Sequence, residues 1–423
     1  MLVVDPARLK IHPTTDPNME PVTPESVAIA SSQLERIGTH LQQRYIDPGK
    51  IPGSLTMVAR RGQPCYLQAL GLRDVERGKP MTEDTIFRIY SMTKPITSLA
   101  LMTLYERGLF SLNDPVHRFI PSWKKLAVRK GGSWPLFATE SCKRPMTVRD
   151  LLMHTSGLTY DFMQASNIDY AYRKLGVGFA KPGYTLHNMI EQLAELPLEF
   201  SPGERWNYSV STDVLGYLVE VISGMSFADY LRQTIFEPLA MVDTSFEISP
   251  DKLDRFASCY QRDLAGNMVL HDDGQASQFA ERSFISGGGG LLSTMHDYYR
   301  FCQMLYNGGS LNGQRIIGSR TLAYMSRNHL PNGGDMSHYA MGSFSETGYE
   351  GVGFGLGLAQ KVDAVKNGYP ASEGSYFWGG LASTLFWIDP AEELTVIFMT
   401  QLIPSSTYNF RGQLESIIYA ALD

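Results

Sequence analysis

The chain is poor in cysteine and carries no excess of basic residues. Its 423 residues include only four cysteines, Cys65, Cys142, Cys259 and Cys302, which lie far apart and match neither a paired zinc spacing nor a dense disulfide framework. Lys and Arg together number 37 against 43 Asp and Glu, and the formal net charge of −6 argues against nucleic acid as a partner. We therefore expect free thiols, a reducing compartment and no nucleic-acid ligand.

Signals for membranes and for export are also missing. Residues 1–5 lack the positive charge and the apolar stretch that begin a signal peptide. The most apolar helical candidate, residues 96–110, is interrupted by threonine, serine and charged side chains, so it is too polar to cross a bilayer. These features predict a soluble, cytoplasmic protein without a membrane partner.

Several common catalytic motifs do not occur. There is no Gly-x-Ser-x-Gly, which argues against the nucleophile elbow of an α/β-hydrolase. Neither His-Glu-x-x-His nor Cys-x-x-Cys is present, so we expect no metal site. The four glycines at 287–290 are not followed by Gly-Lys-Ser/Thr and do not predict a phosphate loop. The chemistry has to come from other side chains.

What the sequence does contain is ample apolar material, with 43% hydrophobic residues and a length typical of two or three structural units. Five prolines predict an extended lead-in over residues 1–24. Four apolar residues at three- and four-residue steps, Leu34, Ile37, Leu41 and Tyr45, then predict an amphipathic helix. β-rich runs at 54–59 and 65–70, separated by a turn at Gly62, predict a β-hairpin.

The C-terminal part of the sequence predicts a β-meander closed by a helix. Residues 354–361, 376–388 and 394–401 alternate or run apolar between turn-forming residues, and residues 413–421 have a helical pattern. The simplest architecture is an α/β fold in which residues 25–110 and 281–423 form one antiparallel sheet flanked by the terminal helices. A mainly helical domain, residues 111–280, is inserted between them.

A Ser-x-x-Lys pattern spans Ser91 to Lys94, between a short predicted strand and a helix. On a helix these two positions share a face, so the lysine amine can approach the serine oxygen. The lysine can accept a proton where burial or nearby cations keep part of the amine uncharged. The pattern is not specific alone, because Ser122 and Ser249 begin the same one, and a serine cap with a solvated lysine is the alternative. Pro95 favours a helix that begins close to Ser91, with the serine at the positive end of the dipole.

A Pro-Gly turn at 202–203 leads to Tyr208, which has a serine as its next neighbour. A phenol with an ordinary pKa of about 10 acts as a base only where cations favour its anion, and a neighbouring lysine supplies one. Tyr208 is therefore a candidate only if it lies beside Lys94. The alternative is a buried tyrosine whose hydroxyl is satisfied.

Trp378, Gly379, Gly380 and Leu381 lie at the centre of the predicted strand of residues 376–388. Paired glycines weaken a strand and often mark a place where a ligand or another backbone approaches closely. A backbone N–H just after the glycines, together with that of Ser91, would form an oxyanion hole. The alternative is a strand kink without function.

Taken in order, these motifs and Leu-Leu-x-His-Thr-Ser-Gly-Leu at 151–158 resemble the serine β-lactamase-like superfamily, and most closely its family VIII carboxylesterases. The likeness extends from about residue 25 to the C-terminus. It implies a β-lactamase-like fold with the site between the two domains. It also implies that Ser91 is the nucleophile, that Lys94 and Tyr208 move protons, and that the N–H groups of Ser91 and Leu381 form the oxyanion hole.

Two departures from the β-lactamase pattern bear on the substrate. Penicillin-recognising relatives have Lys-Thr-Gly where this chain has Trp-Gly-Gly, so a cation that would hold a carboxylate is replaced by an apolar ring. Val210 stands where those relatives have an asparagine that bonds the substrate amide.

Tyr160 belongs to an aromatic-rich segment, residues 159–188, that we expect to cap the pocket and set acyl-chain size. We expect the substrate to contact Trp378, Gly379, Gly380, Tyr160 and Val210.

The sequence thus predicts a serine carboxylesterase that hydrolyses small to medium uncharged esters through an acyl-enzyme on Ser91, without a cofactor. Three alternatives stay open. A β-lactamase or D-alanyl peptidase would use the same nucleophile, an acyltransferase would pass the acyl group to an alcohol, and a non-catalytic relative would only bind a ligand. A small-molecule ester is the predicted partner, and the sequence does not define the oligomeric state.

Overall fold

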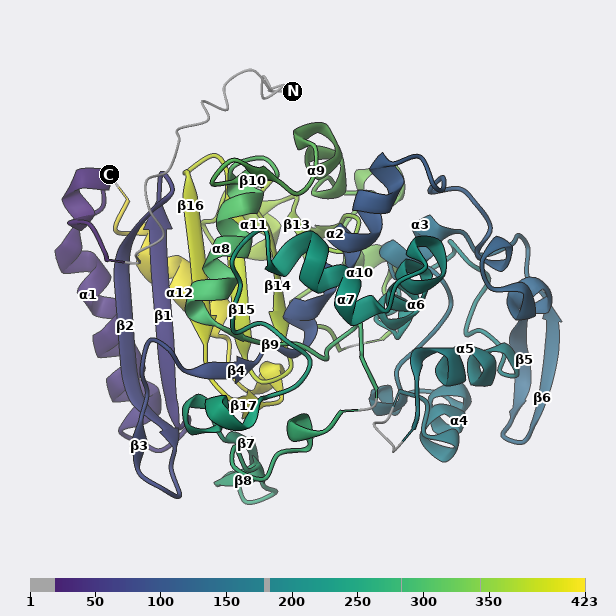
Figure 1. Ribbon diagram of the computed structural model, residues 1–423, viewed down its shortest axis with the longest axis horizontal. Helices are drawn as coiled ribbons and strands as arrows, with labels where there is room; N and C mark the ends of the chain where they lie inside the picture. Colours follow the sequence, from purple (N-terminus) through teal and green to yellow (C-terminus); the bar gives the residue numbers. More distant parts are fainter. Residues whose placement is uncertain (1–19, 179–182, 283, 343, 423) are drawn as a thin grey trace.

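A computed structural model describes residues 20–178, 183–282, 284–342 and 344–422, so the predicted lead-in, residues 1–24, falls almost wholly outside the described residues. An antiparallel eight-stranded sheet forms one half of the molecule (Figure 1). Its strands, in spatial order, are β12 (Val352–Phe354), β13 (Ala359–Lys361), β14 (Tyr376–Gly380), β15 (Thr384–Asp389), β16 (Leu394–Met399), β1 (Gly53–Arg60), β2 (Gln63–Asp74) and β3 (Lys79–Pro80). The two ends of the chain meet where β16 pairs with β1, with Leu55 opposite Met399. The predicted α/β fold is confirmed.

The predicted N-terminal hairpin is formed by β1 and β2. Arg60 pairs with Gln63, and the two residues between them, Arg61 and Gly62, both have positive φ, of 54° and 74°. A two-residue turn of this kind matches the right-handed twist of the flanking strands. The glycine therefore occupies a position that needs a left-handed backbone, as the sequence predicts.

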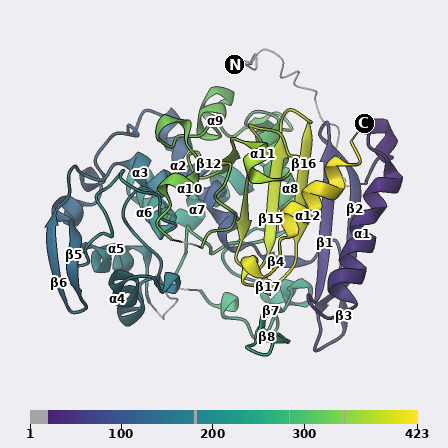
Figure 2. The ribbon, with the colours of Figure 1, turned by 180° about the vertical axis from the view of Figure 1, so that it is seen from behind.

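Helices cover both faces of the sheet. α12 (Phe410–Tyr419) lies in front of the sheet in Figure 2, with α1 (Ser31–Leu41) packed beside it, and α8 (Met295–Tyr306) lies on the opposite face. The four apolar residues that predict the first helix are buried, and the helix continues as a short π-helical turn, Gln42–Ile46. Ile29 pairs with Leu422, so the ends of the described chain lie side by side.

The other half of the molecule is mainly helical (Figure 1). Its helices are α2 (Thr93–Glu106), α3 (Val148–Leu152), α4 (Asn167–Leu175), α5 (Leu186–Ala194), α6 (Ser211–Ser223) and α7 (Phe227–Leu231). α2 is buried over most of its length and packs against α6. A hairpin of β5 (Ala127–Ser133) and β6 (Leu136–Ser141) lies at the outer edge of this half, whereas the hairpin of β7 (Cys259–Arg262) and β8 (Met268–Asp272) lies below the sheet half in Figure 1.

Shorter elements connect the two halves. β4 (Ile86–Arg88) pairs with β9 (Leu292–Thr294), and β17 (Leu402–Ile403) runs parallel to β7. The remaining short elements are β10 (Ser310–Leu311), β11 (Gln314–Arg315), α9 (Ser319–Met325), α10 (Met336–Tyr339) and α11 (Ala364–Asn367). β4 leads directly into α2, so the segment around Ser91 lies where the sheet half meets the helical half.

The prediction of a single strand over residues 376–388 is wrong. The run forms a hairpin of β14 and β15, in which Gly380 pairs with Thr384 and Ser383 turns the chain with a left-handed φ of 66°. Trp378, Gly379 and Gly380 therefore end a strand and do not lie at its centre. Both strands are buried along their whole length, and only the small polar residues Ser383 and Thr384 interrupt the apolar pattern at the turn.

Within the described residues, no single helix has the length and apolar character needed to cross a membrane. In the part of the chain that the structure describes, only the bent pair Ser211–Ser223 and Phe227–Phe236, which meet at 83°, satisfies those criteria together. The described residues also contain no group of three or more His, Cys, Asp or Glu arranged to hold a metal ion. The four cysteines are free thiols.

Candidate active site

Ser91 lies in a sharp turn that joins β4 to α2. The turn is a short 3-10 segment, Tyr90–Met92, and Tyr90 has a left-handed φ of 41°, which is uncommon for a residue with a side chain. Pro95 falls in the first turn of α2, where a missing N–H costs no intrahelical hydrogen bond. The helix therefore begins two residues after Ser91, close to the predicted position.

Lys94 is buried, and its Nζ lies 3.1 Å from Ser91 Oγ. The same amine donates a hydrogen bond to the carbonyl oxygen of Gly288 at 2.7 Å. Burial lowers the pKa of Lys94 to about 8, although the carboxylates of Asp213 and Glu346 act in the opposite direction. A useful fraction of the amine is therefore uncharged close to neutral pH, as a base for the serine requires.

Tyr208 completes the predicted group of three. Its ring centre lies 4.5 Å from Lys94 Nζ, and the side chain is 1% exposed. Burial raises the pKa of Tyr208 well above its usual value and the nearby Glu346 adds to the rise, while the Ser91 hydroxyl and the Trp378 indole oppose it. Among the described residues, the phenol oxygen has no hydrogen-bond partner of normal geometry. The phenol therefore keeps its proton at rest. It is not the lysine-stabilised anion that a tyrosine base would require.

Aromatic rings fix the position of Tyr208. Its ring packs against His154 at 5.1 Å, Trp378 at 5.5 Å and Tyr160 at 5.3 Å between ring centres. His154 Nδ1 also lies 3.2 Å from the hydroxyl oxygen of Ser209, the next residue along the chain. His154 thus supports the tyrosine by packing and by this polar contact.

The segments predicted to supply the oxyanion hole are in direct contact. A Cβ atom added to Gly380 would lie 2.3 Å from the carbonyl oxygen of Ile89, two residues before Ser91. Only a glycine allows the end of β14 to come this close to the serine turn. Leu381 follows Gly380 directly, so its N–H and that of Ser91 come from adjoining backbone segments. Their role as the oxyanion hole stays a prediction.

The other residues predicted to contact the substrate are placed as follows. The ring of Trp378 is buried against Tyr208, and the centre of the Tyr160 ring lies 5.2 Å from Lys94 Nζ. Val210 is buried, and its N–H donates to the carbonyl oxygen of Thr159. Part of the predicted cap, residues 179–182, lies outside the described residues. Substrate contact by these residues stays a prediction.

Asp213, which the sequence analysis does not single out, holds the loop that orients Lys94. It lies in the first turn of α6, and its Oδ1 accepts from Ser286 Oγ at 2.5 Å and from the N–H of Gly288 at 3.0 Å. The carbonyl of the same Gly288 accepts from Lys94. A Cβ atom at Gly288 would lie 2.6 Å from Asp213 Oδ2, so the glycine run allows close packing. The four glycines at 287–290 were the feature of the sequence that could have indicated this closely packed loop.

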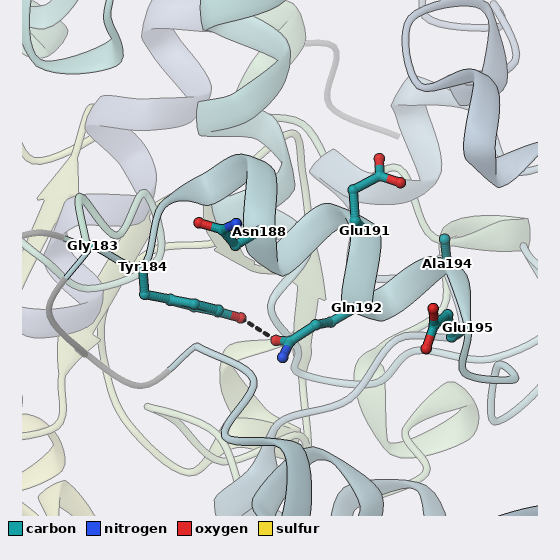
Figure 3. Close-up of a pocket in the computed structure, with 7 residues that line it drawn as sticks. All are labelled: Gly183, Tyr184, Asn188, Glu191, Gln192, Ala194 and Glu195. Carbon is teal, nitrogen blue, oxygen red and sulfur yellow. Dashed lines mark hydrogen bonds between the residues drawn. The ribbon is translucent and has the colours of Figure 1, made fainter.

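Two cavities differ in their relation to this site. One, of about 540 Å³, lies along α5 (Figure 3), where the Tyr184 hydroxyl donates to Gln192 Oε1. Its described lining includes none of the candidate residues. The other, of about 660 Å³, lies between residues 344–350 and the start of α12, and is lined by Glu346 and Arg411. Glu346, which lines this second cavity, also interacts with the Ser91 hydroxyl and the Lys94 amine.

Comparisons with known proteins agree with this architecture. The sequence model of the Beta-lactamase family matches residues 39–413. Esterase EstB of Burkholderia gladioli is 32% identical over 368 residues, which are 83% of this chain and 86% of EstB. The structure of EstCE1, described as a hydrolase with promiscuous acyltransferase activity, aligns with a TM-score of 0.75 and 28% identity over 92% of this chain and 98% of its own. Simvastatin synthase (LovD) of Aspergillus terreus, at 24% identity, has the same fold with a TM-score of 0.76 over 92% of this chain and 98% of its own.

Proposed function

Because the chain belongs to the Beta-lactamase family and is a serine ester hydrolase, we propose that it is a carboxylesterase acting on small to medium uncharged esters through an acyl-enzyme on Ser91. One observation carries the proposal. A buried lysine amine with a lowered pKa contacts a serine hydroxyl, next to a tyrosine that retains its proton. This combination provides a nucleophile, a base and a proton donor in one place.

In the acylation step, Ser91 Oγ attacks the ester carbonyl carbon while uncharged Lys94 takes the hydroxyl proton. The negative charge on the carbonyl oxygen is met by the N–H groups of Ser91 and Leu381. As the bond to the alcohol breaks, Tyr208 gives its proton to the departing alkoxide and regains one from Lys94. Water then attacks the acyl-enzyme, its proton passes to the same pair, and the Ser91 oxygen leaves protonated with the acid released.

The charges around Ser91 support an uncharged substrate. The apolar ring of Trp378 occupies the place at which penicillin-recognising relatives carry a lysine, and it is buried against Tyr208. Glu346 adds a carboxylate on the adjoining wall. An anionic substrate would meet this carboxylate without the cation that holds it in those relatives. We therefore expect β-lactams and D-alanyl peptides to be poor substrates.

Intact-mass spectrometry after treatment with a fluorophosphonate tests the nucleophile. The wild type should gain one adduct that maps to Ser91, and Ser91→Ala should gain none. In parallel, turnover of p-nitrophenyl butyrate should greatly exceed that of nitrocefin. No adduct on the wild type, or an equal adduct on Ser91→Ala, would contradict catalysis by Ser91, and comparable turnover of nitrocefin would favour a β-lactamase.

Acyl transfer to an alcohol is a second candidate function, and the similarity to EstCE1 favours it. The acyl-enzyme would be the same, and an alcohol would replace water in the second step. Adding a competing alcohol and measuring the products by gas chromatography separates the two activities. Free acid as the main product supports the esterase, whereas a new ester as the main product supports an acyltransferase.

A further inference from the structure

Glu346 reaches the site from a loop that packs over Tyr208. The ring centre of Phe344, two residues earlier, lies 6.3 Å from that of Tyr208 and 5.5 Å from that of Phe162. Glu346 Cβ lies 3.3 Å from the place where Gly379 would carry a Cβ atom, so the glutamate stands against the end of β14. Its side chain also lines the cavity of about 660 Å³. The carboxyl group therefore forms part of the wall between Ser91 and this cavity.

One oxygen of this carboxyl group is buried and has no partner. Oε2 has almost no exposed surface, and no hydrogen bond reaches it from the described residues. Burial raises the pKa of Glu346, and the Ser405 and Ser91 hydroxyls and the cations Lys94 and Arg411 near the carboxyl group oppose this rise. A buried polar atom without a partner carries a free-energy cost unless a ligand satisfies it.

The nearby cation Arg411 is already occupied. Its Nη2 donates to the carbonyl oxygen of Trp378 at 2.8 Å and its Nη1 to that of Phe386 at 3.1 Å. The guanidinium also lies 4.4 Å from the centre of the Phe377 ring. Arg411 is thus held against the backbone of β14 and β15, and Glu346 Oε2 is left as an acceptor.

The charges on both sides of Glu346 restrict what can bind there. An anionic group would be repelled by the carboxylate, and a cationic group would stand near both Lys94 and Arg411. A neutral hydroxyl in the cavity can donate to the partly exposed carboxylate of Glu346 and adds no charge. The cavity beyond it has polar side chains at Tyr369, Ser405, Ser406 and Asn409, which suit a hydroxylated group.

We propose that Glu346 determines substrate specificity by accepting a hydrogen bond from a hydroxyl group of an uncharged ester, in the part of the substrate that extends into this cavity. The inference rests on the proposed esterase activity and names the substrate class of that same site. A site built to bond a substrate hydroxyl discriminates strongly against an analogue that lacks it, because its own polar group is then left unpaired.

Matched esters test the proposal on the wild-type enzyme. 3-Hydroxypropyl butyrate and n-butyl butyrate have equal chain length and differ in a hydroxyl against a methyl group at the alcohol end. Butyl 4-hydroxybutyrate and butyl pentanoate place the same difference at the acyl end. One hydroxylated ester should have a kcat/KM roughly 10- to 100-fold above that of its partner, as expected for a hydrogen bond to a charged acceptor. The 3-aminopropyl ester and an ester with a terminal carboxylate should both be poorer than the hydroxylated one.

Substitution of Glu346 should reduce this preference. Glu346→Gln keeps the size and one acceptor but loses the charge, so the ratio should fall by about 10-fold, and Glu346→Leu should bring it close to one. Glu373→Gln, an exposed change in the turn before β14, is the matched control and should keep the wild-type ratio. Acid release in a pH-stat measures all of these rates.

The outcomes separate this inference from the proposed function. A wild type that hydrolyses n-butyl butyrate but prefers neither hydroxylated ester overturns the role of Glu346 and leaves the esterase standing. Equal ratios in the wild type and Glu346→Leu overturn it as well. Failure to hydrolyse any of the esters, with no adduct on Ser91, would contradict the proposed function itself. A wild-type ratio close to one overturns the role of Glu346 even if both Glu346 variants fail to fold.

Discussion

At the scale of single residues, burial has opposite effects on the amine and the phenol beside Ser91. Removal from water disfavours the charged form of each group, so it lowers the pKa of Lys94 and raises that of Tyr208. In the proposed mechanism, Lys94 is therefore the group that gains and loses a proton near neutral pH. Tyr208, with its proton retained, is suited to donate to the leaving alcohol.

The pH dependence of hydrolysis should follow Lys94. The amine must be uncharged to accept the serine proton, so kcat/KM should rise with pH along a limb with an apparent pKa of about 8. Lys94→Arg should lower kcat/KM by at least about 100-fold and remove this limb, because a guanidinium does not lose its proton in this range. Rates with p-nitrophenyl butyrate from pH 5 to 9 provide the measurement. A limb that persists unchanged in Lys94→Arg would contradict the assignment of the base.

Asp213 should influence the same limb from a distance. Its carboxylate raises the pKa of Lys94 and holds the Gly288 carbonyl that accepts from the amine. Asp213→Asn can still accept from Gly288 but loses the charge, so the limb should move to lower pH and kcat should fall several-fold. A purely structural role would lower the rate without moving the limb. Asp251→Asn, an exposed aspartate change elsewhere, should alter neither quantity.

The sequence predicted three candidate residues that the structure brings together, but it did not predict the residues that surround them. Ser91, Lys94 and Tyr208 belong to short motifs whose chemistry can be recognised locally. Asp213 accepts from the N–H of Gly288, which is far from it in the chain and comes close only after folding. Glu346 likewise lies on a loop that comes close to Gly379 only in the folded structure. No local pattern identifies such pairs, because their partners are set by tertiary packing.

At the scale of secondary-structure elements, the site depends on the contact between the end of β14 and the serine turn. The apolar pattern of residues 376–388 predicted one strand where the structure has two, because both strands are buried along their whole length. The paired glycines were the local signal of a close approach. The structure identifies what approaches Gly380, namely the backbone at Ile89.

Replacing Gly380 should disturb this contact more than replacing its neighbour. A Cβ at Gly380 would lie 2.3 Å from the Ile89 carbonyl oxygen, so Gly380→Ala must push β14 and the serine turn apart. Loss of one oxyanion donor costs about 2.7–4 kcal/mol, so kcat should fall by roughly 100- to 1,000-fold. In Gly379→Ala the nearest atom is 3.2 Å away, and the loss should be much smaller. Equal kcat values for the two variants would show that the contact does not position a donor.

At the scale of the whole molecule, segments from the beginning, middle and end of the chain meet beneath Ser91. The sequence predicted that the N- and C-terminal strands share one sheet, and the pairing of β1 with β16 confirms this. The order of the strands and their partners could not be predicted, because alternating patterns show which faces are buried but not which strands are neighbours. Long-range pairing is fixed by the complete core.

Arg88, three residues before Ser91, links these segments. Its side chain is fully buried and donates to Asp272 Oδ2 at 2.7 Å and to the Ala257 carbonyl oxygen, while its own carbonyl accepts from Gln401 Nε2 at 3.1 Å. The guanidinium also lies 4.0 Å from the centre of the Phe256 ring. A lysine would keep the charge, but its single ammonium group cannot reproduce these directed contacts.

Arg88→Lys should therefore destabilise the protein and weaken the site together. The lost hydrogen bonds to a buried charge correspond to about 2–3 kcal/mol in the free energy of unfolding. Thermal unfolding followed by circular dichroism should show a lower midpoint, and kcat for p-nitrophenyl butyrate should fall because the chain from Arg88 leads directly into the serine turn. Arg61→Lys, in an exposed pair with Glu393, should change neither. An Arg88→Lys variant with wild-type midpoint and kcat would show that the three segments hold the Ser91 turn without this side chain.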